Sequence, residues 1–148
     1  MLRHVARILV VEDNLVNQKV VSAVLGRRGF AIEIANDGQE ALAKLEGGAF
    51  DLILMDVQMP VLDGLETTRL IRQNEQWKFI PIVAMTAHAM VGDRERCLEA
   101  GMTAYVSKPV HPSHLVQIVE DHLLAEVRIT EPRAQASGSP VSQAATPR

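Results

Sequence analysis

Three carboxylates follow two short apolar segments of this sequence. Asp56 comes directly after the run Leu52–Met55, and Glu12 and Asp13 come directly after the run Ile8–Val11. Continuous apolar runs of this length are typical of buried strands, and open α/β sheets place their chemistry at the carboxyl ends of such strands. We therefore expect the three acids to lie together at one edge of a sheet.

A hydroxyl group and an ammonium group complete this set of strand-end residues. Thr86 ends the apolar run Ile80–Met85, and Lys108 follows soon after the short run Tyr105–Val106. Together with the three acids, they make a set of groups that suits a small phosphoryl-transfer site.

The charge of this set predicts a metal ion. Three ionised carboxylates outweigh the single ammonium, and like charges so close together capture either protons or a cation. A divalent cation would neutralise the excess, and ligands that are all oxygen favour Mg²⁺ over zinc or copper. The sequence thus predicts a magnesium site at Glu12, Asp13 and Asp56.

Asp56 is the predicted nucleophile of this site. The metal, the Lys108 ammonium and the Thr86 hydroxyl could each take one oxygen of a phosphoryl group as charge spreads in a loose transition state. Attack by the central carboxylate would then give an aspartyl-phosphate. A serine nucleophile would need a general base, and no histidine stands among the strand-end groups.

Strand-like and helix-like segments alternate five times along the chain. Each strand needs a crossover to return in the same direction, so this alternation predicts an α/β fold with a single doubly wound parallel sheet and helices on both faces. The predicted strands are Ile8–Val11, Ala31–Ala35, Asp51–Met55, Pro81–Met85 and Ala104–Val106. The predicted helices are Leu15–Arg28, Gln39–Leu45, one after the loop Met59–Gly64 to about Arg72, one from about Gly92 to Ala100, and one after Pro109.

Length, net charge and the distribution of apolar residues exclude some domain arrangements and classes of function. The 148 residues suit one domain, which we place at residues 1–126, and residues 127–148 are predicted to be a disordered tail or linker because they offer little to bury. A net charge of −3 argues against nucleic-acid binding. No apolar stretch approaches the roughly 20 residues that span a bilayer. We expect a cytoplasmic protein without direct membrane contact.

These motifs resemble the receiver domain of two-component response regulators. The resemblance covers about Ala6 to Ala125, and the joint occurrence of its motifs in this order is highly specific. The residues of these motifs are most similar to those of receivers of hybrid histidine kinases. The motifs are Glu12-Asp13-Asn14, Asp56 with Met59-Pro60 and Asp63-Gly64, Thr86-Ala87, and Lys108-Pro109, with Asn17 and His88-Ala89-Met90 as the hybrid-kinase signature.

The resemblance implies a flavodoxin-like strand order of 2-1-3-4-5 and a role for each site residue. Asp56 would be the phosphoacceptor, Glu12 and Asp13 the metal acids, and the backbone carbonyl of Gln58 a further ligand of Mg²⁺. Thr86 and Lys108 would contact the phosphoryl group, Tyr105 would be the aromatic switch residue, and the Lys108–Pro109 peptide bond would be cis.

The resemblance also implies how the domain works. The phosphoryl donor would be a histidine kinase or a histidine-containing phosphotransfer domain. The protein would catalyse its own phosphorylation and dephosphorylation without being a stand-alone turnover enzyme. A homodimer on phosphorylation stays open, as does the choice between a free-standing regulator and a piece of a hybrid histidine kinase.

Two other functional classes remain to be weighed. A phosphatase of the haloacid dehalogenase type also uses an aspartate, a lysine and Mg²⁺, but it places a second aspartate two residues after the nucleophile, where this chain has Gln58. A flavin-binding module would need a phosphate-cradling loop after the first strand, where Glu12 and Asp13 would repel a phosphate. No glycine-rich nucleotide loop is present, so kinase activity within this chain is not predicted.

Two features have a functional and a purely structural interpretation. Tyr105 alone would more often be a half-buried packing residue than a switch. The first predicted helix carries more apolar side chains than the roughly 100° stripe that faces a core, so some of them should stay exposed beside the site and receive a helical partner. Alternatively, they pack against the last helix or are singly exposed. They are Leu15, Val16, Val20, Val21, Ala23, Val24 and Leu25.

Overall fold

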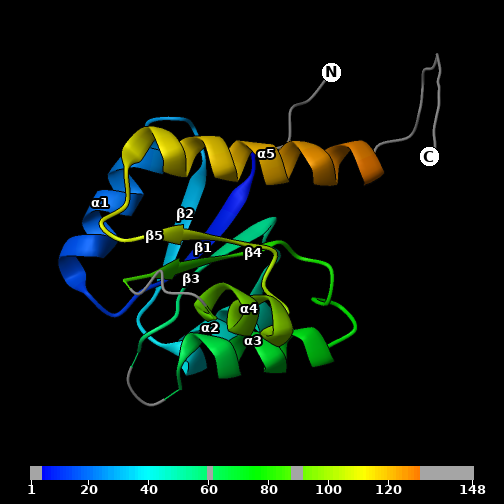
Figure 1. The fold of residues 1–148 in the computed structure, drawn as a ribbon. Helices are drawn as coiled ribbons and strands as arrows, with labels where there is room; N and C mark the ends of the chain where they lie inside the picture. Colours follow the sequence, from blue (N-terminus) through cyan, green and yellow to red (C-terminus); the bar gives the residue numbers. More distant parts are fainter. Residues whose placement is uncertain (1–4, 60–61, 88–91, 131–148) are drawn as a thin grey trace.

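The apolar runs form the strands of one parallel sheet in the computed structural model, which describes residues 5–59, 62–87 and 92–130. Within these residues strands and helices alternate as the sequence predicts (Figure 1). The strands are β1 (Arg7–Val11), β2 (Ala31–Ala35), β3 (Leu52–Asp56), β4 (Ile82–Thr86) and β5 (Ala104–Ser107). The helices are α1 (Leu15–Gly26), α2 (Gly38–Gly47), α3 (Gly64–Gln73), α4 (Asp93–Ala100) and α5 (Pro112–Thr130).

The sheet has the order β2-β1-β3-β4-β5, and every neighbouring pair is parallel. This confirms the doubly wound, flavodoxin-like fold. β3 lies at the centre between β1 and β4, so Asp56 ends a strand that has a partner on each side. The strand order reverses beside β1, and such a switch point is where open α/β sheets bind their ligands.

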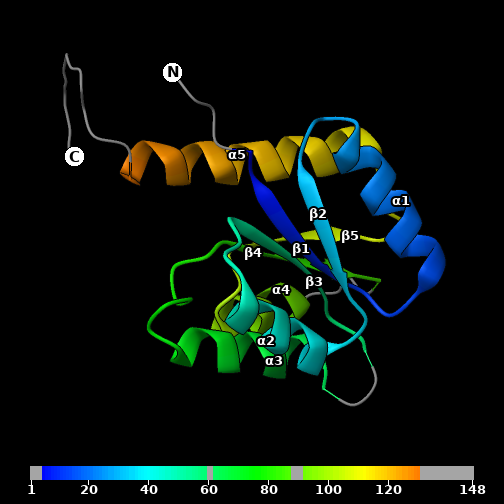
Figure 2. The same ribbon diagram turned by 180° about the vertical axis from the view of Figure 1, so that it is seen from behind.

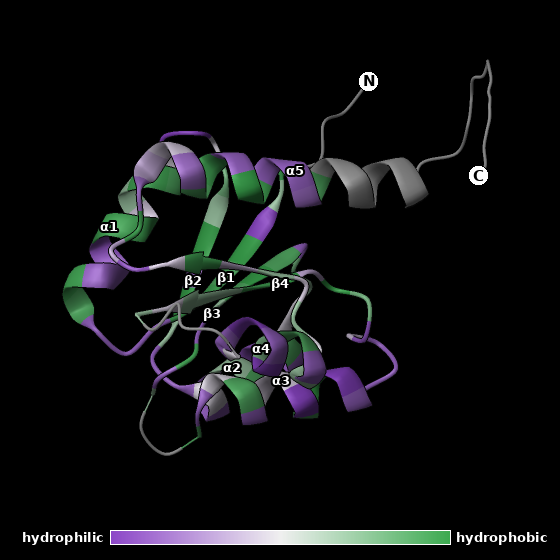
Figure 3. Ribbon diagram, in the orientation of Figure 1, coloured by the Kyte–Doolittle hydropathy of each residue, from purple (hydrophilic) through white to green (hydrophobic). Residues whose placement is uncertain are grey.

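Successive strand residues point to opposite faces of the sheet, and each face has its own core. α1 and α5 cover one face, while α2, α3 and α4 cover the other (Figures 1 and 2). The strands are apolar along most of their length, whereas the helices carry polar residues on their outer sides (Figure 3). The α1/α5 core includes Ile8, Val10, Leu54, Val21 and Leu115. The other core includes Leu9, Ile53, Met55, Leu45 and Ile71.

Several element boundaries differ by a residue or two from the predicted ones. Asp56 and Thr86 are the last residues of β3 and β4, whereas the sequence placed them just after the strands. α1 begins at the predicted cap, where Asn14 Oδ1 accepts a hydrogen bond from Asn17 N at 3.0 Å, and it ends at Gly26, before the predicted Arg28. Gly29 then takes a left-handed φ of 91°, which favours glycine.

The last helix continues beyond the predicted end of the domain. α5 runs to Thr130, past residue 126, which the change in composition had marked as the last residue of the domain. Residues 131–148 lie outside the described residues, so the predicted tail there stays a prediction. Pro60 and the segment His88-Ala89-Met90 of the sequence motifs also lie outside them. Within the described residues, no helix is long and apolar enough to span a membrane.

Candidate functional site

The three predicted acids meet at the carboxyl edge of the sheet. β1 and β3 are neighbours, which brings Glu12 and Asp13 after β1 close to Asp56 at the end of β3. One carboxylate oxygen from each acid lies within 4.8 Å of the other two. Glu12 and Asp56 are buried and Asp13 is exposed, so the cluster opens to solvent on one side. Three convergent carboxylates with a solvent-facing side fit Mg²⁺, which binds through oxygen and keeps several waters.

Lys108 joins this cluster from the end of β5. Its Nζ lies 3.0 Å from Glu12 Oε1 and 3.1 Å from Asp56 Oδ1. The backbone N–H of Lys108 donates to the Thr86 carbonyl at 2.8 Å, which ties the β5 end to the β4 end. The Lys108–Pro109 peptide bond is cis, as the resemblance implied.

Burial and neighbouring charges change the acidity of two of these groups. Desolvation by burial and then the Glu12 carboxylate raise the pKa of Asp56 from 3.8 to about 7, against the lowering effect of Lys108. Burial alone would lower the pKa of Lys108, but its hydrogen bond to Glu12 and the charges of Asp56 and Glu12 raise that pKa instead. A cation bound next to Asp56 would lower this raised pKa and favour the ionised carboxylate.

Gln58, two residues after β3, contacts both Asp56 and Thr86 at the end of β4. The Gln58 backbone N–H donates to Asp56 Oδ1 at 3.2 Å, and the Gln58 side-chain amide lies 3.5 Å from Thr86 Oγ1. Thr86 is only 2% exposed. The structure therefore brings Thr86 to the same edge as Asp56, while the role of the Gln58 carbonyl as a metal ligand stays a prediction.

Helix α3 begins in close contact with the backbone of β3. Asp63 caps the helix by accepting a hydrogen bond from Glu66 N at 2.8 Å. Gly64 N donates to Val57 O at 3.0 Å, and a Cβ on Gly64 would lie only 2.2 Å from the Asp56 carbonyl oxygen. Only glycine leaves room for this approach, which fixes the loop that follows the nucleophile.

Hydrogen bonds also hold the segment that carries Glu12 and Asp13. Glu12 N donates to the Ala35 carbonyl at 3.0 Å, and Glu12 Oε2 accepts a hydrogen bond from Asn14 N at 3.0 Å. The Gln18 amide donates to the Glu12 carbonyl at 2.6 Å. The sequence analysis did not identify Gln18. Its signal was a polar residue in the buried stripe of α1, three and seven residues before Val21 and Leu25.

Tyr105 is not part of the acid cluster. Its ring is partly buried, packs against the core on the α2–α4 face, and has the Arg94 guanidinium 6.0 Å from its centroid. This is the packing interpretation of the residue, and its switch role stays a prediction.

The apolar side chains of α1 divide as the sequence predicted. Val21 and Leu25 are buried, whereas Leu15, Val16 and Val20 are 62%, 67% and 44% exposed. The expectation that some of them stay exposed is confirmed.

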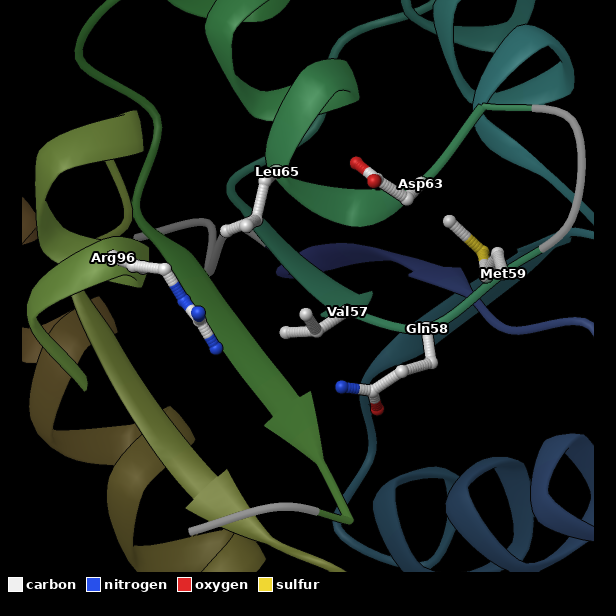
Figure 4. A pocket seen from close by; sticks show the side chains of 6 residues that line it. All are labelled: Val57, Gln58, Met59, Asp63, Leu65 and Arg96. Atoms are coloured by element: carbon white, nitrogen blue, oxygen red, sulfur yellow. The ribbon is translucent and has the colours of Figure 1, made fainter. Parts of the chain in front are cut away.

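A pocket of about 500 Å³ lies beside the acid cluster, between the segment after β3 and helix α4 (Figure 4). Its lining residues are Val57, Gln58, Met59, Asp63, Leu65 and Arg96. None of the three acids lines it, so the predicted phosphoryl site is the open edge next to this pocket.

Curated relatives of this chain include hybrid histidine kinases. Hybrid signal transduction histidine kinase I of Dictyostelium discoideum is 46% identical over 124 residues, which cover 79% of this chain and 7% of that protein. Histidine kinase 5 of Arabidopsis thaliana is 36% identical over 143 residues, which cover 79% of this chain and 16% of that protein. The chain thus spans only a small part of these curated relatives.

Solved structures of receiver domains have the same fold. The receiver domain of a sensor histidine kinase from Pseudomonas aeruginosa PAO1, with a magnesium ion in its active-site cleft, is 43% identical with a TM-score of 0.76, covering 81% of this chain and 98% of that one. The co-crystal structure of the Saccharomyces cerevisiae histidine phosphotransfer protein Ypd1 and the receiver domain of Ssk1 matches with a TM-score of 0.79 and 29% identity, over 88% of this chain and 97% of the matched chain.

The sequence profile of the response regulator receiver domain matches residues 8–120, which contain every predicted site residue and all five strands apart from Arg7 at the start of β1. With the carboxylate cluster, the lysine contacts and the strand order already in place, this match identifies the chain as a member of the response regulator receiver family of two-component signalling.

Proposed function

We propose that this domain accepts a phosphoryl group on Asp56 from a phosphohistidine, in a reaction that requires Mg²⁺. The observation that carries the proposal is the convergence of three carboxylates within 4.8 Å and of Lys108 Nζ, 3.0 and 3.1 Å from two of them. Such a cluster costs folding free energy, because like charges repel and buried charges lose water. That cost is offset when a divalent cation and a phosphoryl group bind there.

Each residue of the site has one task in the proposed reaction. The Asp56 carboxylate attacks phosphorus, the P–N bond to the donor histidine breaks, and a P–O bond to Asp56 forms. Lys108 exchanges its contact with the free Asp56 carboxylate for one with a phosphoryl oxygen, and the Thr86 hydroxyl takes another oxygen. Mg²⁺ held by Glu12, Asp13, Asp56 and the Gln58 carbonyl would neutralise the charge that the phosphoryl oxygens bring. Tyr105 would then respond to the new position of Thr86.

The exposed apolar side chains of α1 are the proposed docking surface for the phosphoryl donor. Leu15, Val16 and Val20 lie on the helix that starts directly after Asp13 and Asn14. An apolar patch next to a reactive carboxylate suits an amphipathic helix that presents a phosphohistidine. The structure of a receiver together with a histidine phosphotransfer protein among the similar structures supports this class of donor.

The wider setting follows from the same proposal. The protein acts as a phosphorylation-controlled switch that catalyses its own phosphorylation and dephosphorylation, and it works in the cytoplasm without direct contact with membrane or nucleic acid. Its donor is a histidine kinase or a histidine-containing phosphotransfer domain. The alternative of a haloacid dehalogenase-type phosphatase has less support, because the amide of Gln58 cannot act as the general acid and base that such an enzyme needs.

Phosphorylation by a small acyl phosphate tests the requirement for metal. We expect acetyl phosphate to label the protein in Mg²⁺ and not in excess chelator, because without the cation only Lys108 would offset the negative charge of the incoming group. The measurement is the mass of the intact protein over time in both solutions. Full labelling in chelator would contradict the proposal.

A further inference from the structure

The Gln18 side chain is a buried amide in helix α1 whose nitrogen donates two hydrogen bonds. Gln18 is 8% exposed, and its Nε2 donates to the Glu12 carbonyl oxygen at 2.6 Å and to Asn36 Oδ1 at 2.7 Å. A buried amide that made no hydrogen bonds would lose the free energy of its hydration, so both bonds matter to the folded state. The Gln18 amide nitrogen therefore donates to one backbone carbonyl and to one side-chain oxygen.

The first acceptor belongs to the peptide group that joins the two metal acids. The Glu12 carbonyl is part of the Glu12–Asp13 peptide, so a hydrogen bond to it fixes the plane from which the Asp13 backbone departs. On the other side of Glu12, its N–H donates to the Ala35 carbonyl at 3.0 Å. The Gln18 bond thus holds the carbonyl side of Glu12, next to Asp13.

The second acceptor is itself held in place. Asn36 follows β2, and its backbone N–H and side-chain nitrogen donate to Glu40 Oε1 at 2.8 and 3.1 Å. Glu40 lies in the first turn of α2, which Asp37 caps. Gln18 therefore ties the peptide between the metal acids to a turn that is anchored at the start of a helix.

We propose that Gln18 is a positioning residue for the metal site, because its amide sets the direction in which Asp13 offers its carboxylate. Asp13 is exposed, so packing constrains it less than the buried Glu12 and Asp56. Groups that orient metal ligands act on metal affinity in this way. This inference rests on the proposed function, since it assumes that the cation which Glu12, Asp13 and Asp56 bind is Mg²⁺.

Replacing Gln18 by methionine tests the proposal, because methionine keeps the length of the side chain and removes both donors. We expect Gln18→Met to weaken Mg²⁺ binding about 10-fold to 100-fold, as measured by titration calorimetry on the unphosphorylated protein. The Mg²⁺ concentration that gives half the maximal rate of labelling by acetyl phosphate should rise by the same factor. The rate at saturating Mg²⁺ should stay close to that of the unmodified chain, because Gln18 touches neither Asp56 nor the phosphoryl group.

Val21→Ala is the matched control. Val21 is buried three residues further along the same helix, but it faces the apolar core. This variant should lower the melting temperature and leave Mg²⁺ affinity unchanged. The proposal is overturned if Gln18→Met binds Mg²⁺ like the unmodified chain, or if Val21→Ala weakens binding as much.

A second variant covers the case in which Gln18→Met does not fold. Asn36 is exposed, so Asn36→Ala should fold, remove one of the two Gln18 contacts and weaken Mg²⁺ binding less than Gln18→Met. Unchanged affinity in Asn36→Ala would then count against the proposal. If the unmodified chain binds Mg²⁺ but takes no phosphate on Asp56, the proposed function fails while the calorimetric comparison still tests Gln18.

Discussion

Asp56 is a carboxylate that the fold has removed from water and placed beside a second buried carboxylate. It is 1% exposed, with Glu12 also in the cluster and Lys108 Nζ at 3.1 Å. Desolvation and repulsion raise its pKa to about 7, and one lysine does not fully compensate. The metal-free site is therefore under electrostatic strain, and the ligands we propose are the ones that relieve it.

Asp56→Asn should stabilise the domain in chelator, and the gain should grow with pH. The pKa of Asp56 in the folded protein is about 7, above the ordinary value of 3.8. At a pH between these two values, the folded protein therefore keeps a proton on Asp56 that the unfolded chain has lost. The free energy of unfolding of the unmodified chain should therefore fall, relative to Asp56→Asn, as pH rises from about 4 to about 7. We expect a difference on the order of 1–2 kcal/mol at pH 8 once solvent screening is included.

Urea unfolding of both proteins at several pH values measures this difference. Lys108 Nζ also lies 3.0 Å from Glu12 Oε1, so we expect that pair to remain in the variant and the comparison to isolate the Asp56 charge. A variant that is less stable than the unmodified chain at pH 8, or a gain that shrinks with rising pH, would contradict the electrostatic account.

The sequence predicted which residues gather at one edge of the sheet, because residue type and position after an apolar run were enough, and the roles assigned to these residues stay predictions. The structure confirms that Asp56, Glu12, Asp13, Thr86 and Lys108 reach one edge of the sheet. The sequence did not show that Gln18 supports the acids, since whether a glutamine in a helix faces water or a carbonyl depends on contacts with β1 and β2.

Close backbone packing between the end of β3 and the start of α3 positions Asp56, in addition to the burial of apolar side chains. Asp56 is the last residue of β3, whereas the predicted strand ended one residue earlier, at Met55. The sequence showed where the apolar run ends but not where the backbone pairing of the strand ends. A residue with a polar side chain can still pair through its backbone with the neighbouring strand. Gly64 marks where α3 meets this strand end.

Gly64→Ala should destabilise the domain by about 1–3 kcal/mol, because the new Cβ would lie against the Asp56 carbonyl and force the backbone apart. Gly26→Ala is the control: this glycine ends α1 and has no atom within 4 Å of a Cβ, so stability should stay equal or rise by up to about 1 kcal/mol. Urea midpoints of both variants measure the effects. Equal stability of the two variants would show that α3 can move away from β3 at little cost.

Val20→Glu should slow phosphotransfer from a protein donor and leave labelling by acetyl phosphate unchanged. Val20 belongs to the proposed docking surface, where a charge would have to lose water against the partner helix. Leu98→Glu on α4 is the matched control, because Leu98 is also 44% exposed. The measurement is the rate of transfer from a histidine phosphotransfer protein that phosphorylates the unmodified chain.

Two outcomes would count against the docking surface. Equal loss with both donors would indicate a disturbed fold, and no change with either donor would remove α1 from the interface.

Among the features of the whole molecule, the sequence predicted the parallel sheet but neither the order of its strands nor the end of α5. Alternation of runs such as Ile8–Val11 with helical segments predicted a parallel sheet with helices on both faces, since crossover connections leave few other solutions. The order of the strands came from resemblance, because the apolar run of β3 is the same whether it sits at the centre or the edge. The extension of α5 to Thr130 was missed, because composition near residue 126 suggested a tail.

The proposed role of Asp56 as the phosphoryl acceptor is tested by mass spectrometry after reaction with acetyl phosphate in Mg²⁺. We predict that the unmodified chain gains one phosphoryl group that hydroxylamine removes, whereas Asp56→Asn, folded and at least as stable, gains none. Phosphate on the Asp56→Asn chain at the rate of the unmodified chain would show that another residue is the acceptor and would contradict the account.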